Sequence, residues 1–397
     1  MVSSRKATGV LFVSILLAML AYGMTLPLFP FMIENLGGRG IHLGLLVALY
    51  GVMQLLFAPL WGKASDKKGR KPFILLGVSG FILAMTVFAF ANSLWMLYAG
   101  QVFMGVLGSA LFPVSMAYVA DFSDENTRAG SLGKLGAAIG LGVVLGPGIG
   151  GLLAFDSLSL PFLAGAGLSL PVLMIIAVWL PEYKNTDLEF RAEPEKPKSG
   201  FEFLKALWGP AGFGLFIVFA VYFGKSNFSG IYGLYAMERY GYTTTEIGSL
   251  LMMMGLVYAL VQGLIVGPLT KRFGEGVIIT YCLLGNAVGF IFLILAYNYL
   301  MVAMSISFFI AFNAALKPSA LSFISKNSSG KQGTAMGFAD AYMSVGRTVG
   351  PLWAGFVFDI NRNIPFIGGA VFFFLVFAAS LVYNRRKNSI RAAAENI

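Results

Sequence analysis

Charge is scarce in this sequence. Of its 397 residues, 28 are Lys or Arg and 18 are Asp or Glu, whereas 57% are hydrophobic and the mean hydropathy is +0.79. So few charged side chains cannot cover the surface of a water-soluble protein of this length. The composition therefore predicts a protein whose main solvent is a lipid bilayer.

Cysteine and histidine are almost absent. The lone Cys282 excludes an internal disulfide, and the lone His42 excludes a histidine cluster for zinc or an imidazole proton relay. The sequence LGPGIGG lacks the Gly-Lys-Ser/Thr ending that holds ATP phosphates. We expect no cofactor, no metal and no enzymatic activity. The net charge of +10 lies in short segments between apolar runs, which favours membrane orientation over a nucleic-acid partner.

The apolar runs predict twelve membrane helices, because one crossing needs about 20 residues. Two runs are long enough for helical hairpins, with turns near ANS at 91–93 and YNY at 297–299. Two other spans, 210–237 and 332–358, qualify only if internal charges are tolerated. The predicted spans are 7–33, 40–62, 72–120 as a hairpin, 135–155, 157–181, 210–237, 247–270, 276–316 as a hairpin, 332–358 and 363–384.

The basic residues orient these spans. Loops on one side carry most of the Lys and Arg residues, whereas the opposite loops carry only Arg39, Arg239 and Arg362. By the positive-inside rule, both termini lie in the cytoplasm. Short loops and a short N-terminus favour the plasma membrane of a prokaryote.

The chain also contains an internal duplication. GKASDKKG from Gly62 recurs as GPLTKRFG from Gly267, and LGPGIGG from Leu145 recurs as VGPLWAG from Val349, at offsets of 205 and 204 residues. A polar, Pro- and Gly-containing stretch separates the two copies. We predict an N-terminal six-helix bundle at 1–181, a cytoplasmic linker at 182–208 and a C-terminal six-helix bundle at 209–397.

Two motifs carry a family resemblance. GKASDKKGRK resembles the loop motif G-x-x-x-D-x-x-G-R-K of the major facilitator superfamily, and GVVLGPGIGG resembles a helix-5 signature of its twelve-helix drug/proton antiporters. The matched positions are Gly62, Asp66, Gly69, Arg70 and Lys71 in the loop, and Gly142, Gly146, Pro147, Gly150 and Gly151 in helix 5.

The resemblance implies an all-α membrane protein with twelve transmembrane helices in two pseudo-symmetric six-helix bundles. It also implies a conformational latch, in which Asp66 contacts a helix N-terminus of the other half and Arg70 pairs with Asp121. Gly62 and Gly69 would permit a tight turn there. The helix-5 glycines are implied to limit leakage between the halves, and close packing alone is the alternative.

Five ionisable residues fall within the spans: Lys134, Lys225, Lys317, Asp340 and Arg347. Lys134 is near a helix end and can extend to the surface. Asp340 is the candidate for proton coupling: its protonation would release Lys317 or Arg347. The alternative is a fixed buried ion pair.

The predicted substrate cavity departs from the family pattern. Gln101, ahead of Gly105, stands where the family places an arginine, and the intramembrane cations favour an anionic or zwitterionic substrate. Tyr50 with Gln54, and Tyr258 with Gln262, each place two polar side chains on one helix face. The candidate cavity residues are Tyr22, Gln54, Gln101, Phe112, Tyr222, Lys225, Ser229, Tyr232, Tyr258, Gln262 and Asn313.

The leading interpretation is a monomeric, proton-coupled exporter of amphipathic organic compounds or drugs, in contact with membrane lipids. The first alternative is a carrier of an organic anion or an anionic or zwitterionic lipid headgroup, which would use Lys225, Lys317 and Arg347. The second is a non-transporting sensor on a carrier fold. The sequence leaves substrate identity and transport direction open.

Overall fold

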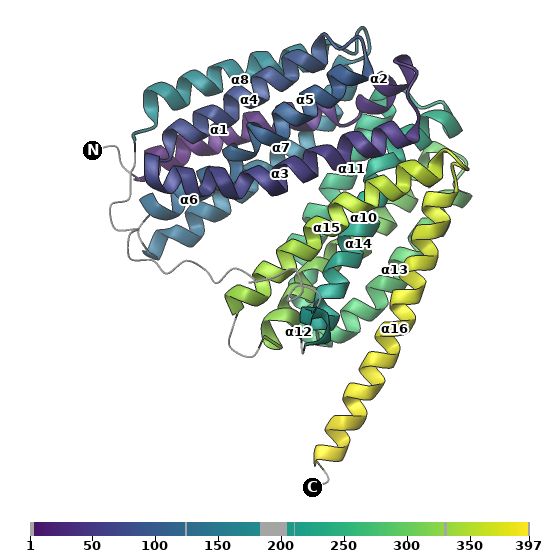
Figure 1. Cartoon of the computed structure of the whole chain (residues 1–397). Helices are drawn as coiled ribbons and strands as arrows, with labels where there is room; N and C mark the ends of the chain where they lie inside the picture. The colour runs from purple at the N-terminus through teal and green to yellow at the C-terminus, as the bar shows by residue number, and fades with distance from the viewer. Residues whose placement is uncertain (1–3, 124, 183–204, 210, 329–331, 396–397) are drawn as a thin grey trace. The chain divides into compact units, whose positions relative to one another are not determined.

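The computed structural model describes residues 4–123, 125–182, 205–209, 211–328 and 332–395, and its regular structure over these residues is helical (Figure 1). The predicted linker at 182–208 lies mostly outside them. The first part of the chain contains α1 (Ser4–Thr25), α2 (Phe29–Asn35), α3 (Gly40–Lys68), α4 (Lys71–Ala89), α5 (Leu94–Val106), η1 (Gly108–Ala110), α6 (Leu111–Phe122), α7 (Glu125–Leu153) and α8 (Leu160–Trp179).

The second part begins with the short η3 (Ala206–Trp208). It continues with α10 (Gly212–Tyr240), α11 (Thr244–Leu260), the π-helical segment η4 (Val261–Ile265), α12 (Val266–Phe273), α13 (Glu275–Leu295), α14 (Tyr299–Lys326), α15 (Gln332–Phe358) and α16 (Ile364–Glu395).

Eleven helical spans of the described residues are long and apolar enough to cross a membrane. Two of them run through an irregular turn, from Leu94 to Phe122 and from Thr244 to Phe273. The twelfth predicted span is helical as α15, and its 27 residues are long enough to cross. It is more polar than the other eleven, since Asp340, Ser344, Arg347 and Thr348 lie within it.

Two helix breaks lie beside prolines, whereas five other prolines lie inside continuous helices. The first predicted span, 7–33, is two helices, because α1 ends at Thr25 and α2 begins at Phe29 on either side of Pro27, which has no backbone N–H. The α5–α6 span changes to the 3-10 turn η1 just before Pro113, which cannot donate to a carbonyl in that turn. Trp61 Nε1 donates to the Val106 carbonyl at 2.6 Å and so satisfies an acceptor at this break.

The chain forms two compact units. The first contains residues 1–192 with 233–255, and the second contains 193–232 with 256–397. In the first, α1 packs against α7 and α8, and α4 packs against α8. In the second, α13 packs against α14 and α16 (Figure 1). The predicted domain boundaries differ from these units at 233–255 and stay a prediction.

Phenylalanine rings fill both cores. In the first unit, Phe29 packs edge-on against Phe88 at a ring distance of 5.2 Å, and Phe162 lies 5.5 Å from Phe88. In the second, Phe290 contacts Phe309 at 4.7 Å and Phe373 at 6.0 Å. These apolar clusters hold the helices that present the polar residues described next.

Candidate functional site

A buried arginine joins the turn after α3 to α6. Arg70 Nη2 and Nε donate to Asp121 Oδ2 at 2.8 and 3.1 Å. Its Nη1 donates to Ser65 Oγ at 2.8 Å and pairs with Asp66 Oδ1 at 2.5 Å. The side chains of Arg70 and Asp121 are 7% and 8% exposed, whereas that of Asp66 is 43% exposed. The structure therefore joins the residues that we expected to form a latch within the first unit.

The turn beside this network depends on one glycine. Gly69 has a φ of +96°, which strongly favours glycine, and the Glu182 carboxyl group lies where its side chain would be. Gly62 lies inside α3 with open space around it, so our prediction that it forms the turn is wrong. The expected contact of Asp66 with a helix in the other half stays a prediction.

The second unit contains an ion pair at the positions equivalent to Arg70 and Asp121, with its charges reversed. Glu275 accepts a hydrogen bond from Ser322 Oγ at 2.9 Å and forms an ion pair with Lys326. Glu275 lies 205 residues after Arg70, and Lys326 lies 205 residues after Asp121. Gly274, at the position equivalent to Gly69, also has a positive φ, +78°. The duplication therefore preserves the ion pair and the turn, but not the sign of each charge.

Residue identity does not reveal this second pair, because Glu275 and Lys326 replace Arg70 and Asp121. Lys271, at the position of Asp66, indicated only that the acidic residue is lost. The 205-residue register, applied to Arg70 and Asp121, would have found the pair directly.

The helix-5 glycines pack α7 against α1 on one face. A Cβ atom at Gly146 would lie 2.6 Å from Gly23 Cα, and one at Gly142 would lie 2.7 Å from the Leu20 nitrogen. A Cβ atom at Gly150 would meet the Met24 backbone. These three glycines recur every four residues, so they line one side of α7 and let the two backbones touch.

The other glycines of the motif face α11, within the same compact unit. Thr244 and Thr245 donate their hydroxyl groups to the Gly151 carbonyl at 3.1 and 3.0 Å. A Cβ atom at Gly151 would lie 3.2 Å from Gly248 Cα, and one at Gly148 would lie 2.7 Å from Met252 Sδ. At this level of α7 its backbone is in close contact with α1 on one side and with α11 on the other. The adjacent Gly150 and Gly151 leave room for these two contacts.

The second unit also has glycines at a close helix–helix contact. A Cβ atom at Gly350 would lie 2.6 Å from the Phe223 carbonyl oxygen, and one at Gly346 would lie 2.6 Å from that of Phe219. Gly346 and Gly350 lie 204 residues after Gly142 and Gly146. Thus α15 packs on α10 in the second unit as α7 packs on α1 in the first.

Two of the predicted cavity residues, Tyr22 and Gln54, lie next to Tyr50 in the first unit. The rings of Tyr22 and Tyr50 lie 5.9 Å apart, and Gln54 Nε2 is 3.4 Å from the Tyr50 hydroxyl. Gln101 is buried in α5, whereas Phe112 of α6 is 38% exposed. The structure thus brings Tyr22, Tyr50 and Gln54 together as one polar and aromatic surface.

Three cations converge in the second unit. Lys225 Nζ of α10 lies 4.4 Å from the Tyr258 ring centre, and Lys317 Nζ of α14 lies 5.8 Å from that of Tyr222. The Arg347 guanidinium of α15 lies 5.1 Å from the Tyr222 ring. We call Lys225, Lys317 and Arg347 the cationic triad. In the described part of the chain, none of the three forms an ion pair within 4.0 Å with a carboxylate.

The energies of this arrangement are unfavourable without an anion. A charged side chain costs about 2.5–3.5 kcal/mol near the centre of a bilayer-spanning helix by insertion scales. A cation–π contact is favourable by about 0.5–2 kcal/mol and so offsets only part of this cost. Tyr222 is the ring partner of both Lys317 and Arg347. The three like charges also repel one another. The triad is therefore a site at which negative charge would be strongly favoured.

Asp340 lies on α15 with an exposed side chain and forms no ion pair with another described residue. Its backbone carbonyl accepts a hydrogen bond from Ser344 Oγ at 2.8 Å. The expected pairing of Asp340 with Lys317 or Arg347 is absent from this arrangement of the described residues. Its role in proton coupling stays a prediction.

Four other candidates have different surroundings. Asn313 is buried and donates to Asn286 Oδ1 at 3.2 Å, between α14 and α13. Tyr232 is buried and stacks on Phe228 at a ring distance of 4.9 Å. These two side chains pack within the protein interior. Ser229 and Gln262 are exposed, and Gln262 lies in the π-helical turn η4, a distortion that is frequent at functional sites.

Comparison with known proteins gives the same architecture. The family model described as Major Facilitator Superfamily matches residues 11–221 and again residues 214–396. The chain belongs to the Major Facilitator Superfamily. The double match fits the duplication that the sequence and the paired glycines show. Members of this family are transporters and not enzymes, so this facilitator is a multi-pass membrane transport protein.

Relatives of this facilitator extend over nearly the whole chain. It is 27% identical over 395 residues to "Multidrug resistance protein 2" of Bacillus subtilis (strain 168), covering 98% of both chains. It is 31% identical over 365 residues to "Quinolone resistance protein NorA" of Staphylococcus aureus (strain COL), covering 91% of this chain and 92% of that protein. A crystal structure of the nucleoside transporter NupG has the same fold, with a TM-score of 0.77, 13% identity, and coverage of 95% of this chain and 99% of that one.

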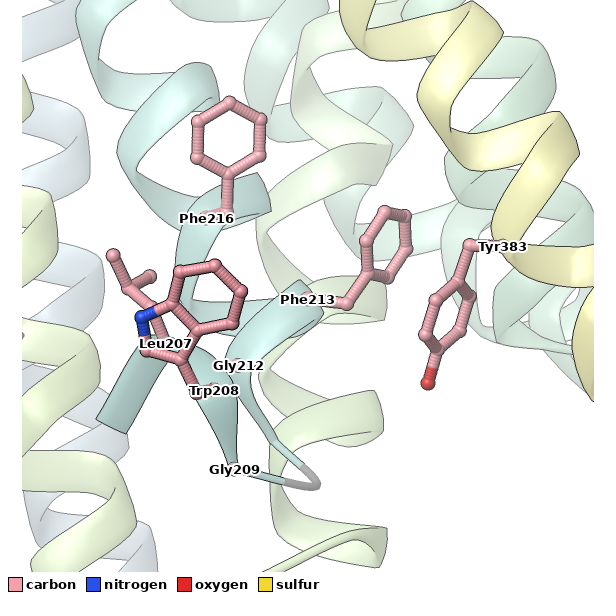
Figure 2. Close-up of a pocket in the computed structure, with 7 residues that line it drawn as sticks. All are labelled: Leu207, Trp208, Gly209, Gly212, Phe213, Phe216 and Tyr383. Atoms are coloured by element: carbon pink, nitrogen blue, oxygen red, sulfur yellow. The ribbon is translucent and has the colours of Figure 1, made fainter. Parts of the chain in front are cut away.

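This facilitator also has a hollow of about 640 Å³ at the start of α10 (Figure 2). Phe213 stacks on Tyr383 at a ring distance of 4.2 Å, and Trp208 beside them is 92% exposed. None of the described residues that line it carries a charge. An exposed Trp near a helix end is typical of the membrane–water interface, so we interpret the hollow as an interfacial anchor.

Proposed function

We propose that this facilitator exports amphipathic organic compounds by alternating access and uses the proton gradient as its energy source. The observation that carries the proposal is its near full-length similarity to proteins named for multidrug and quinolone resistance. The absence of a P-loop motif from the sequence fits secondary rather than ATP-driven transport. A small amphipathic molecule and protons would be its partners, and a monomer in the lipid bilayer its working form.

The motif geometry supports this proposal. The glycine contacts of α7 with α1 would keep the first bundle rigid, and those with α11 would form the contact that opens and closes. Arg70 and its carboxylates would stabilise the turn after α3. Both sets of contacts would then contribute to a conformational equilibrium, with both termini in the cytoplasm and the protein in a prokaryotic plasma membrane.

The direct test is transport by the purified protein in proteoliposomes. We expect counterflow, the exchange of labelled for unlabelled compound, with at least one amphipathic dye, and faster accumulation with a pH gradient. Ethidium and pyrenebutyrate are suitable cationic and anionic dyes. Binding without counterflow for either would indicate a sensor and would contradict the proposal. Counterflow with a rate that does not depend on the pH gradient would contradict proton coupling but not the export of amphipathic compounds.

Asp340→Asn is expected to abolish the acceleration by a pH gradient while preserving counterflow. A carboxylate can bind and release a proton, and its amide replacement cannot. The measurement compares dye uptake with and without the gradient, and we expect a several-fold stimulation to disappear. Asp156→Asn, an exposed carboxylate in the turn between α7 and α8, is the matched control. Normal gradient-driven uptake by Asp340→Asn would exclude Asp340 as the coupling residue.

Asp66→Asn is expected to slow transport and leave substrate affinity nearly unchanged. The Asp66 side chain is 43% exposed, so loss of its ion pair with Arg70 should cost at most about 1 kcal/mol of stability. A latch residue changes the rate of conformational exchange without touching the substrate. Counterflow rate and dye binding measured on one preparation separate the two effects. A large loss of affinity would place Asp66 in a binding role.

A further inference from the structure

We propose that the cationic triad of Lys225, Lys317 and Arg347 binds an acidic group of the transported compound. The substrate class would then be an apolar body that carries a carboxylate, sulfonate or phosphate. This inference rests on the proposed transport function and makes its substrate more specific. The triad comes from three helices of one compact unit, α10, α14 and α15, so its members are brought together by the fold and not by sequence proximity.

Within the described residues, these cations face aromatic rings and not a carboxylate. Lys225 faces the Tyr258 ring at 4.4 Å, and both Lys317 and Arg347 face the Tyr222 ring, at 5.8 and 5.1 Å. No carboxylate pairs with them within the described ranges, and the carboxylate of α15, Asp340, is exposed. A compound that carries negative charge would supply the missing counter-ion.

The side chains differ in the way that recognition of such a compound requires. Arg347 presents a planar fork that can donate two parallel hydrogen bonds to a carboxylate or phosphate. The two lysines are point charges on flexible stems, which adapt to compounds of different shape. Tyr222 and Tyr258 add apolar ring surface for the body of the compound. A permanently cationic compound would meet three like charges at this site.

Three probes with one pyrene body and different head groups test the head-group preference. They are pyrenebutyrate, pyrenebutanol and pyrenebutyl-trimethylammonium, and their binding is measured by fluorescence titration of the full-length protein in phosphatidylcholine nanodiscs. We expect the affinity for pyrenebutyrate to be at least about tenfold higher than the affinity for either of the other two probes. Equal or tighter binding of the cationic probe would overturn the proposal.

Charge-neutral variants test the three residues. Lys225→Gln, Lys317→Gln and Arg347→Gln should each weaken pyrenebutyrate binding about tenfold and change pyrenebutanol binding less than about twofold. Lys134→Gln removes an exposed intramembrane cation outside the triad and is the matched control. Lys317→Arg retains the charge and should retain binding. Glutamine variants that melt like the parent protein and bind pyrenebutyrate normally would overturn the proposal.

The acidic group can belong to a free compound or to a lipid. A second arm therefore measures the movement of fluorescent phosphatidylglycerol and phosphatidylcholine between leaflets of proteoliposomes, beside counterflow of pyrenebutyrate. Triad-dependent movement of phosphatidylglycerol supports an anionic lipid, and triad-dependent counterflow of pyrenebutyrate supports a free organic anion. Counterflow of the cationic probe alone would overturn the anionic class and leave the transport function standing. If no probe or lipid moves, the transport function itself fails.

Discussion

Arg70→Met should lower the stability of the folded protein by about 3–5 kcal/mol, the largest effect that we expect from a single substitution. The Asp121 carboxylate would keep its buried position, 8% exposed, and lose its two hydrogen bonds from the guanidinium. A buried charge without a partner is strongly unfavourable. The measurement is the apparent melting temperature of the purified protein in detergent, with dye counterflow on the same samples.

The charge-reversed repeat supplies both controls. Lys326→Met breaks the equivalent pair, but the Lys326 side chain is 65% exposed, so its loss should cost about 1 kcal/mol or less. The triple variant Asp66→Lys, Arg70→Glu, Asp121→Lys copies the signs found at Lys271, Glu275 and Lys326.

We expect the triple variant to recover at least half of the stability that Arg70→Glu alone loses. If stability depends only on having opposite charges at these positions, the acidic and basic residues can be exchanged, as in the second unit. A triple variant no more stable than Arg70→Glu would show that the first unit needs its own signs. Equal melting temperatures of Arg70→Met and the parent protein would contradict the prediction that the buried Asp121 carboxylate needs Arg70 for stability.

The sequence predicts the fold of this facilitator well, because span length is a local quantity. Run lengths located ten apolar crossings and two that depend on tolerated internal charges, and all twelve are helical in the structure. They did not locate helix ends, since polar residues extend helices beyond the apolar run: α3 continues to Lys68 and α14 to Lys326. They also missed the break at Pro27, because hydropathy does not register a missing backbone donor.

The candidate site was less predictable, because it depends on contacts between helices. The sequence indicated Lys225, Lys317 and Arg347 individually, and only the fold places two of them over one ring, Tyr222. It predicted a pairing of Asp340 with Lys317 from similar depth, and with Arg347 from a shared helix face. Asp340 and Arg347 share one face of α15, but seven residues separate them by about 10 Å along the helix axis, and the Asp340 side chain is exposed.

The glycines of α7 give a prediction in which the same substitution has opposite signs on one helix. Gly146→Ala should destabilise the protein by about 1–3 kcal/mol, because its new methyl group would lie 2.6 Å from both Gly23 Cα and the Leu20 carbonyl oxygen. A Cβ atom at Gly140 would have no atom within 4 Å, so Gly140→Ala should stabilise the helix by up to about 1 kcal/mol. Thermal melting of both variants measures the difference.

Gly350→Ala extends this prediction to the duplication. Its methyl group would lie 2.6 Å from the Phe223 carbonyl oxygen, the contact in the second unit that matches Gly146 in the first. We therefore expect Gly350→Ala and Gly146→Ala to destabilise the protein by similar amounts. Gly140→Ala, which we expect to be stabilising, is the control for both. If Gly146→Ala and Gly140→Ala change the melting temperature in the same direction, close packing is not what the α7 glycines provide. Intact stability of Gly146→Ala with impaired counterflow would instead place this glycine in the moving contact of the transport cycle.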